Sequence, residues 1–117
     1  MKPTVFDRER DFQAAVLDMA RTLGCVAYHT HDSRRSEPGF PDLVIVGHRG
    51  VLFRELKTEK GRLSQPQNDW ISRLARAGAD VAVWRPSDWP HAIHDQLRAV
   101  THRPARMSTS PIEGDPS

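Results

Sequence analysis

Two acidic residues and one lysine have the types and the spacing for metal-assisted chemistry. Asp42 directly precedes an aliphatic run that ends at Val46, and Glu55 and Lys57 lie in the run that begins at Val51, after a four-residue turn. If the runs pair as a hairpin with Val46 opposite Val51, paired residue numbers sum to 97 and Asp42 lies opposite Glu55. Directly opposed residues share a face, with Cβ atoms about 4.5–5.5 Å apart. Lys57, two residues after Glu55, shares that face, whereas a slip of one residue would separate the acids.

Two opposed carboxylates repel each other unless a cation or a proton lies between them. Mg²⁺ in proteins takes one or two carboxylates together with water and substrate phosphate. A lysine beside the ion could orient or deprotonate the attacking water, or offset negative charge in the transition state. The set therefore predicts metal-assisted hydrolysis of a phosphodiester.

A simpler interpretation is an exposed ion pair between Glu55 and Lys57, which is common on strands and contributes little to stability. The position of Asp42 favours the metal site over this simpler interpretation. Asp42 follows Pro41 at the start of a strand that is predicted to be buried on both faces. An acid at such a position is costly unless it is paired or bound to a ligand.

The elements expected to position these residues alternate between helices and strands in the order α-β-β-β-α-β-α. Apolar residues at helical spacing end at Gly24, a second helical stripe ends at Gly78, and short β-branched runs lie between them. We expect an α/β fold in which a small mixed β-sheet is flanked by helices. The expected ranges are a first helix ending at about 23, strands 25–30, 43–46, 51–57 and 80–84, and helices 65–77 and 91–99.

Composition indicates one soluble domain. The chain has 117 residues, one cysteine and no apolar run near the roughly 20 residues that a membrane helix needs. No apolar stretch precedes the first charges, so we expect a cytoplasmic protein without a signal peptide. Seventeen basic and 15 acidic residues give a net charge of +2, so any nucleic-acid binding must come from a local basic surface. The domain is expected to span residues 1–102, and the proline-rich residues 103–117 are expected to form a disordered tail.

The ordered motifs of the chain resemble the VRR-NUC family of the PD-(D/E)XK nuclease superfamily. The resemblance covers about residues 9–89 and implies a restriction-endonuclease-like core. The matching segments are Tyr28-His29-Thr30, Arg34-Arg35-Ser36, Gly39-Phe40-Pro41-Asp42-Leu43, Glu55-Leu56-Lys57, Gly61, Leu63-Ser64, Gln67, Trp70, Leu74, Ala77-Gly78 and Val83-Trp84-Arg85-Pro86.

The resemblance also implies roles for individual residues. Asp42 and Glu55 would ligate Mg²⁺ or Mn²⁺ with the backbone carbonyl of Leu56, and Lys57 would be the catalytic lysine. Gln67 and Glu9 match further catalytic positions of the family, on the second and first helices. Each has an equally good structural interpretation: Ser64-x-x-Gln67 is a capping-box pattern, and Glu9 could favour a helix N-terminus through the dipole.

Four basic residues flank the predicted site. Arg34 and Arg35 lie in the loop before Asp42, and Lys60 and Arg62 lie in the loop after Lys57. We expect them to bind DNA phosphates, although solvated loop charge is an equally good interpretation.

The predicted function is a Mg²⁺-dependent DNA endonuclease. Family analogy implies selectivity for branched DNA such as four-way junctions or flaps, and the size and family fit a phage-encoded protein. A nonspecific or nicking nuclease of the same fold, or a non-catalytic DNA-binding module, are the alternatives. One chain offers one active site, so cutting two strands symmetrically would require a homodimer.

Overall fold

The computed structural model describes residues 6, 8–30 and 37–101, so the expected tail 103–117 lies outside the described residues. The order of elements is the predicted one, and a four-stranded mixed sheet has the strand order β1-β2-β3-β4. The first three strands are antiparallel, and β4 runs parallel to β3. The elements are α1 (Glu9–Thr22), β1 (Val26–His29), β2 (Leu43–Val46), β3 (Val51–Leu56), α2 (Gln65–Arg76), β4 (Asp80–Trp84), the 3₁₀ turn η2 (Pro86–Asp88) and α3 (His91–Thr101).

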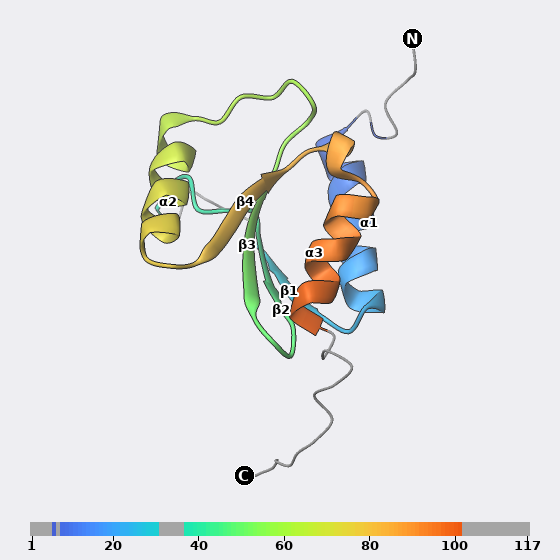
Figure 1. Ribbon diagram of the computed structural model, residues 1–117. Helices are drawn as coiled ribbons and strands as arrows, with labels where there is room; N and C mark the ends of the chain where they lie inside the picture. The colour runs from blue at the N-terminus through green and yellow to red at the C-terminus, as the bar shows by residue number, and fades with distance from the viewer. Residues whose placement is uncertain (1–5, 7, 31–36, 102–117) are drawn as a thin grey trace.

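The helices form layers on both sides of the sheet. Figure 1 shows α1 and α3 side by side on one face and α2 on the other. The core lies between the sheet and the α1–α3 layer. Its central members are Phe12, Val16, Ala20, Leu43, Ile45, Leu52, Leu56, Trp84, Ile93 and Leu97, each at most 1 % exposed. None of the residues of α2 is fully buried, so α2 covers its face of the sheet less completely. None of the helices in the described part of the chain is long and apolar enough to cross a membrane.

The predicted hairpin register is confirmed. Val46 pairs with Val51 and Leu43 pairs with Arg54, so paired residue numbers sum to 97 along the whole β2–β3 ladder. Continuing the same register by one residue brings Asp42 opposite Glu55. Because side chains alternate along a strand, β3 directs Arg54 and Leu56 toward the α1–α3 layer and Glu55 toward the opposite face.

Several expected boundaries differ from the structure. The first strand is shorter than 25–30 and spans Val26–His29, and β3 and α2 each end one residue earlier than expected, at Leu56 and Arg76. The last helix continues past residue 99 to Thr101, because Val100 and Thr101 are buried and the Thr101 hydroxyl donates a hydrogen bond to the carbonyl of Leu97 at 2.9 Å. Burial therefore extends this helix beyond the length that its sequence pattern indicated.

A buried arginine on β3 joins the first residue of β4 to α3. Arg54 is 2 % exposed, and its guanidinium donates to the carboxylate of Asp80 at 2.9 Å and to the amide oxygen of Gln96 at 2.8 Å. It also lies 5.0 Å from the centre of the Trp84 ring, within cation–π range. Burial lowers the pKa of Arg54, and the hydrogen bond and charge of Asp80 oppose that shift. The α1–α3 layer thus encloses one charge that is held by several partners.

We expect Arg54→Ala to lower the free energy of unfolding by about 2–4 kcal/mol, because it leaves a cavity and removes the hydrogen bonds that join β4 to α3. Urea unfolding would measure the change. Arg54→Met, which fills much of the volume, should cost less, and Arg49→Ala in the exposed hairpin turn should change stability by no more than about 0.5 kcal/mol. Equal stability of Arg54→Ala and the parent protein would contradict this assignment.

Candidate active site

Asp42 and the end of β3 are joined by a direct hydrogen bond. The backbone N–H of Leu56 donates to Oδ2 of Asp42 at 2.9 Å. The backbone carbonyl of Asp42 also accepts from the N–H of Thr30 at 2.9 Å, which ties it to the chain just after β1. The Asp42 carboxylate is therefore held against the strand segment that carries Glu55 and Lys57.

Glu55 is a buried carboxylate with one satisfied and one unsatisfied oxygen. Its side chain is on the α2 side of the sheet, and the residue is 2 % exposed. Oε2 accepts a hydrogen bond from the side-chain amide of Gln67 at 2.9 Å, whereas Oε1 is buried and has no hydrogen-bond partner among the residues that the structure describes. Burial and then the negative charge of Asp42 raise the pKa of Glu55 to about 8, although the positive charge of Lys57 acts in the opposite direction.

These groups fit a divalent cation. A buried carboxylate oxygen without a partner costs free energy, and a cation between Glu55 and Asp42 would satisfy it and relieve their repulsion. The described residues contain no group of three or more His, Cys, Asp or Glu side chains placed to hold a metal. Two carboxylates with water and a backbone carbonyl suit Mg²⁺ better than zinc, which needs three or four protein ligands.

Gln67 fulfils both of the roles that its sequence context suggested. Its side-chain oxygen accepts from the N–H of Ser64 at 2.8 Å, and its own N–H donates to the Ser64 hydroxyl at 3.3 Å, which completes a capping box at the start of α2. The other end of the same amide donates to Glu55. Capping therefore fixes the orientation in which Gln67 holds the carboxylate, and the two interpretations do not exclude each other.

The approach of α2 depends on Gly39, whose role we did not derive from the sequence. Gly39 has φ +94°, and a Cβ at this position would lie 2.4 Å from the carbonyl carbon of Pro66. The chain just before Asp42 therefore packs backbone against backbone on the first turn of α2. Only glycine permits this contact, which brings Gln67 within reach of Glu55.

Glu9 lies near the site although it belongs to α1. It is the first residue of that helix, and burial followed by the charge of Asp42 raises its pKa, while Lys57 lowers it. Its carboxylate is therefore within electrostatic reach of both residues. The same position also favours an acid through the helix dipole, so neither interpretation of Glu9 is excluded.

Comparison with known proteins identifies the family. The model of the VRR-NUC domain matches residues 6–103. The chain belongs to the VRR-NUC family of nucleases. A Fanconi-associated nuclease 1 homolog of Schizosaccharomyces pombe is 38 % identical over 56 residues, which span 46 % of this chain but only 8 % of that protein.

Solved VRR-NUC structures share the fold. A VRR-NUC domain protein superposes with a TM-score of 0.61 at 19 % identity and covers 79 % of this chain and 88 % of its own. A second VRR-NUC domain gives a TM-score of 0.58 at 26 % identity, with 78 % and 90 % covered.

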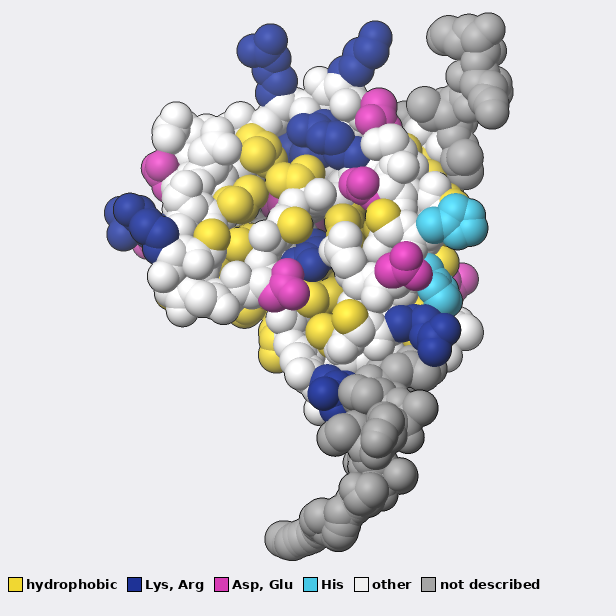
Figure 2. All heavy atoms as spheres, in the orientation of Figure 1, with side chains coloured by type: hydrophobic (Ala, Val, Ile, Leu, Met, Phe, Trp, Pro, Cys, Tyr) yellow, Lys and Arg dark blue, Asp and Glu magenta, His cyan; other side chains and the backbone are white. Residues whose placement is uncertain are grey.

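The basic residues predicted to flank the VRR-NUC site are described only in part. Lys60 and Arg62 are exposed in the loop between β3 and α2. Figure 2 shows Lys and Arg side chains projecting from the end of the molecule that carries this loop. Arg34 and Arg35 lie outside the described residues.

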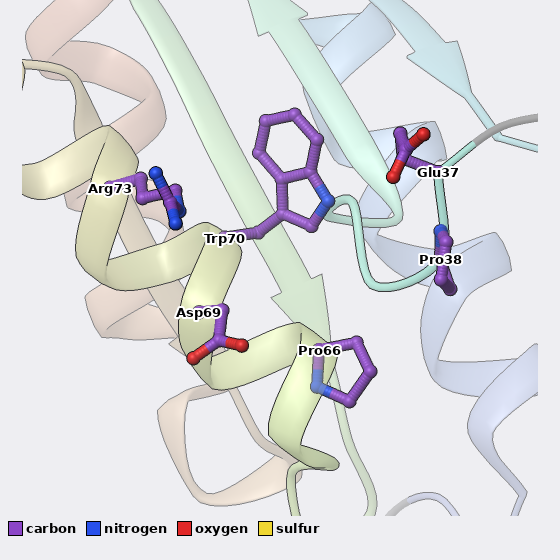
Figure 3. A pocket seen from close by; sticks show the side chains of 6 residues that line it. All are labelled: Glu37, Pro38, Pro66, Asp69, Trp70 and Arg73. Atoms are coloured by element: carbon purple, nitrogen blue, oxygen red, sulfur yellow. The ribbon is translucent and has the colours of Figure 1, made fainter.

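The hollow drawn in Figure 3 is not lined by Asp42 or Glu55. It has a volume of about 340 Å³ and lies between α2 and the segment before Asp42. The Trp70 ring packs edge-on against Phe40, with ring centres 5.0 Å apart. The lining consists of Glu37, Pro38, Pro66, Asp69, Trp70 and Arg73.

The raised pKa of Glu55 predicts a pH-dependent stability of the metal-free VRR-NUC protein. The folded state favours protonated Glu55. The contribution of this carboxyl group to the free energy of unfolding is therefore complete below the ordinary pKa of 4.5 and is lost as the pH rises toward about 8. In EDTA, we expect the melting temperature to fall between about pH 5 and pH 8.5, and to fall less in Glu55→Gln. Added Mg²⁺ should stabilise the parent protein most at the upper end of this range, because binding requires the ionised carboxylate. Identical pH profiles for the two proteins would contradict the assignment.

Proposed function

We propose that this VRR-NUC chain is a metal-dependent DNA endonuclease that hydrolyses backbone phosphodiesters. The observation that carries the proposal is the buried, unpartnered Oε1 of Glu55 beside Asp42. A domain that only binds DNA gains nothing from two converging carboxylates, which repel phosphate. A metal-dependent nuclease needs this arrangement, because the ion converts the repulsion into binding.

Asp42 and Glu55, with the backbone carbonyl of Leu56, would hold Mg²⁺ or Mn²⁺. When bound, the ion would act as a Lewis acid on the phosphate and lower the pKa of a coordinated water. In the proposed mechanism, Lys57 orients the attacking water and offsets negative charge on the reacting phosphate. Gln67 restrains Glu55 through its 2.9 Å hydrogen bond.

Glu9 is proposed as an additional acid of the same site. Its electrostatic contact with Asp42 and Lys57 supports this role. At the first turn of α1, Glu9 would accept a proton, or a hydrogen bond from a metal-bound water. The helix dipole would stabilise its negative charge at the same time.

DNA would be held by the basic loops on both sides of the site. Lys60 and Arg62 are exposed beside Lys57, and Arg34 and Arg35 precede Asp42 in sequence. The small net charge of +2 makes such local contacts the main source of phosphate binding. We propose selectivity for branched DNA, such as four-way junctions or flaps, by analogy with the VRR-NUC family to which the chain belongs. Nonspecific cutting or nicking remains the alternative for the same site.

We expect Lys57→Ala to abolish cleavage, with a loss of at least about 100-fold in kcat, because charge stabilisation at the reacting phosphate disappears. DNA binding should remain largely intact. The measurement is a panel of four-way junction, flap, nicked and linear duplex DNAs in Mg²⁺, in Mn²⁺ and in EDTA, with binding followed by gel shift.

Lys60→Ala is the matched control, because it removes one lysine from the adjacent exposed loop and should weaken binding without abolishing turnover. Full turnover by Lys57→Ala would contradict the assigned role. Binding without cleavage by the parent protein in either metal would favour the DNA-binding alternative.

We further propose a homodimer for cutting two strands, and an apolar surface on the α2 side of the sheet supports it. We call this surface the sheet patch: Val26 (71 % exposed), Tyr28 (63 %), Val46 (44 %) and Val51 (40 %). The β1–β2–β3 register places all four on one face. Tyr28 also lines a cavity of about 330 Å³, together with Glu37 and Trp70.

A second copy suits this surface better than an unrelated partner. The adjoining hollow carries both signs of charge, with Asp69 and Arg73 on α2 and Glu37 on the segment across from it. In a two-fold interface, each sign on one copy can meet the opposite sign on the other. An apolar centre with a charged rim is the usual anatomy of such interfaces.

Light scattering is expected to give twice the mass of one chain for the parent protein and the mass of a single chain for Val46→Glu, because a buried unpaired carboxylate opposes association. Val46→Glu should still nick DNA but lose paired cutting of a junction. Ala14→Glu, on the exposed side of α1, is the control and should remain dimeric. A parent protein that is monomeric both free and on DNA would rule out the dimer.

A further inference from the structure

The side chain of Arg85 is engaged with the backbone of the loop that follows Lys57. Arg85 directly follows β4 and is half-buried. Its Nη1 donates to the carbonyl of Thr58 at 2.7 Å and to that of Gly61 at 2.8 Å, with a longer contact to the carbonyl of Glu59 at 3.3 Å. One guanidinium nitrogen thus donates hydrogen bonds to three carbonyls of a single turn.

Two further contacts connect the same loop to the segment around Arg85. The backbone N–H of Lys57 donates to the carbonyl of Trp84 at 3.1 Å. The side chain of Glu59 accepts from the N–H of Ser87 at 2.9 Å. The chain is therefore held at Lys57, just before the loop, and at Glu59 within it. Arg85 adds the contacts to Thr58 and Gly61.

The fastened loop lies directly against the side chain of Lys57. A Cβ on Gly61 would stand 3.4 Å from Cδ of Lys57 and 2.9 Å from the hydroxyl of Thr58. The space between the Gly61 backbone and the lysine stem is thus about one methyl group wide. Lysine has a long flexible stem that can adopt many rotamers, so a fixed neighbour restricts where its ammonium group can lie.

We propose that Arg85 is a positioning residue for Lys57, acting through the loop of residues 58–61. The proposal rests on the proposed nuclease function, in which Lys57 acts at the reacting phosphate. Arg85 holds the loop, and the loop restricts the lysine stem. Its role does not require contact with DNA, because the donors of Nη1 are directed at carbonyls of the chain itself.

Arginine suits this role better than lysine. The two N–H groups of Nη1 lie in the plane of the guanidinium, so the side chain fixes their directions, and the group stays charged. An ammonium group would keep the charge but not these fixed directions. Replacement by lysine should therefore restore part of the effect, and replacement by glutamine should not.

The first test compares steady-state cleavage by Arg85→Gln, Arg85→Lys and the charge-matched control Arg98→Gln, at the exposed end of α3. Arg85→Gln should lower kcat by about 10- to 100-fold, the range expected when a catalytic group is misplaced by about an ångström, and should change KM by less than about threefold. Arg85→Lys should lie between Arg85→Gln and the parent protein. Arg98→Gln should be unchanged.

The second test asks whether the effect passes through the loop. Gly61→Ala should also lower kcat, because its Cβ would stand 2.9 Å from the Thr58 hydroxyl and the loop must shift beside Lys57. In the double variant with Arg85→Gln, the combined loss of kcat should be smaller than the product of the two single-variant losses, since both changes act on one element. Fully multiplicative losses would overturn the proposal.

The third test does not depend on activity. Hydrogen exchange of the amides at 58–61 should accelerate at least about tenfold in Arg85→Gln, with the core strands unchanged. Unchanged exchange would overturn the proposal, as would a raised KM with unchanged kcat, which would make Arg85 a DNA contact instead. If the parent protein cleaves no DNA, the nuclease proposal fails, and exchange still decides whether Arg85 holds the loop.

Discussion

The close approach of two carboxylates across the β2–β3 hairpin is the constraint on which the other features of the site depend. Asp42 is held by the N–H of Leu56, and Glu55 is buried within the charge field of Asp42. Such an arrangement is unfavourable in isolation, as the rise of the Glu55 pKa to about 8 indicates. The ladder register maintains it, because releasing one acid would require β2 to slip against β3.

Elements outside the hairpin adjust how the carboxylates and the lysine are held. Gly39 allows the chain to pack on α2, the capping box orients Gln67, and Gln67 satisfies one oxygen of Glu55. On the other side, Arg85 fastens the loop beside Lys57. Apart from the side-chain hydrogen bond between Gln67 and Glu55, these contacts involve the backbone, so small displacements of loops would reach the acids and the amine.

The same strand serves stability and the site on opposite faces. Arg54 is enclosed on the α1–α3 side with Asp80, Gln96 and Trp84, whereas the neighbouring Glu55 faces α2. These two adjacent buried ionisable residues, one basic and one acidic, therefore do not pair with each other. Alternation of side chains keeps them apart, and each obtains partners from a different layer.

The sequence by itself determined the order of elements, the hairpin register and the sharing of one sheet face by Asp42, Glu55 and Lys57. These features follow from local periodicity and from a short turn, which fixes which residues stand opposite each other. Tertiary structure alone decided that Gln67 both caps α2 and binds Glu55, that Glu9 comes within reach of Asp42, and that Arg54 and Arg85 find their partners. Those contacts join residues of different layers or loops, and their distances depend on how helices pack on the sheet, which no local pattern encodes.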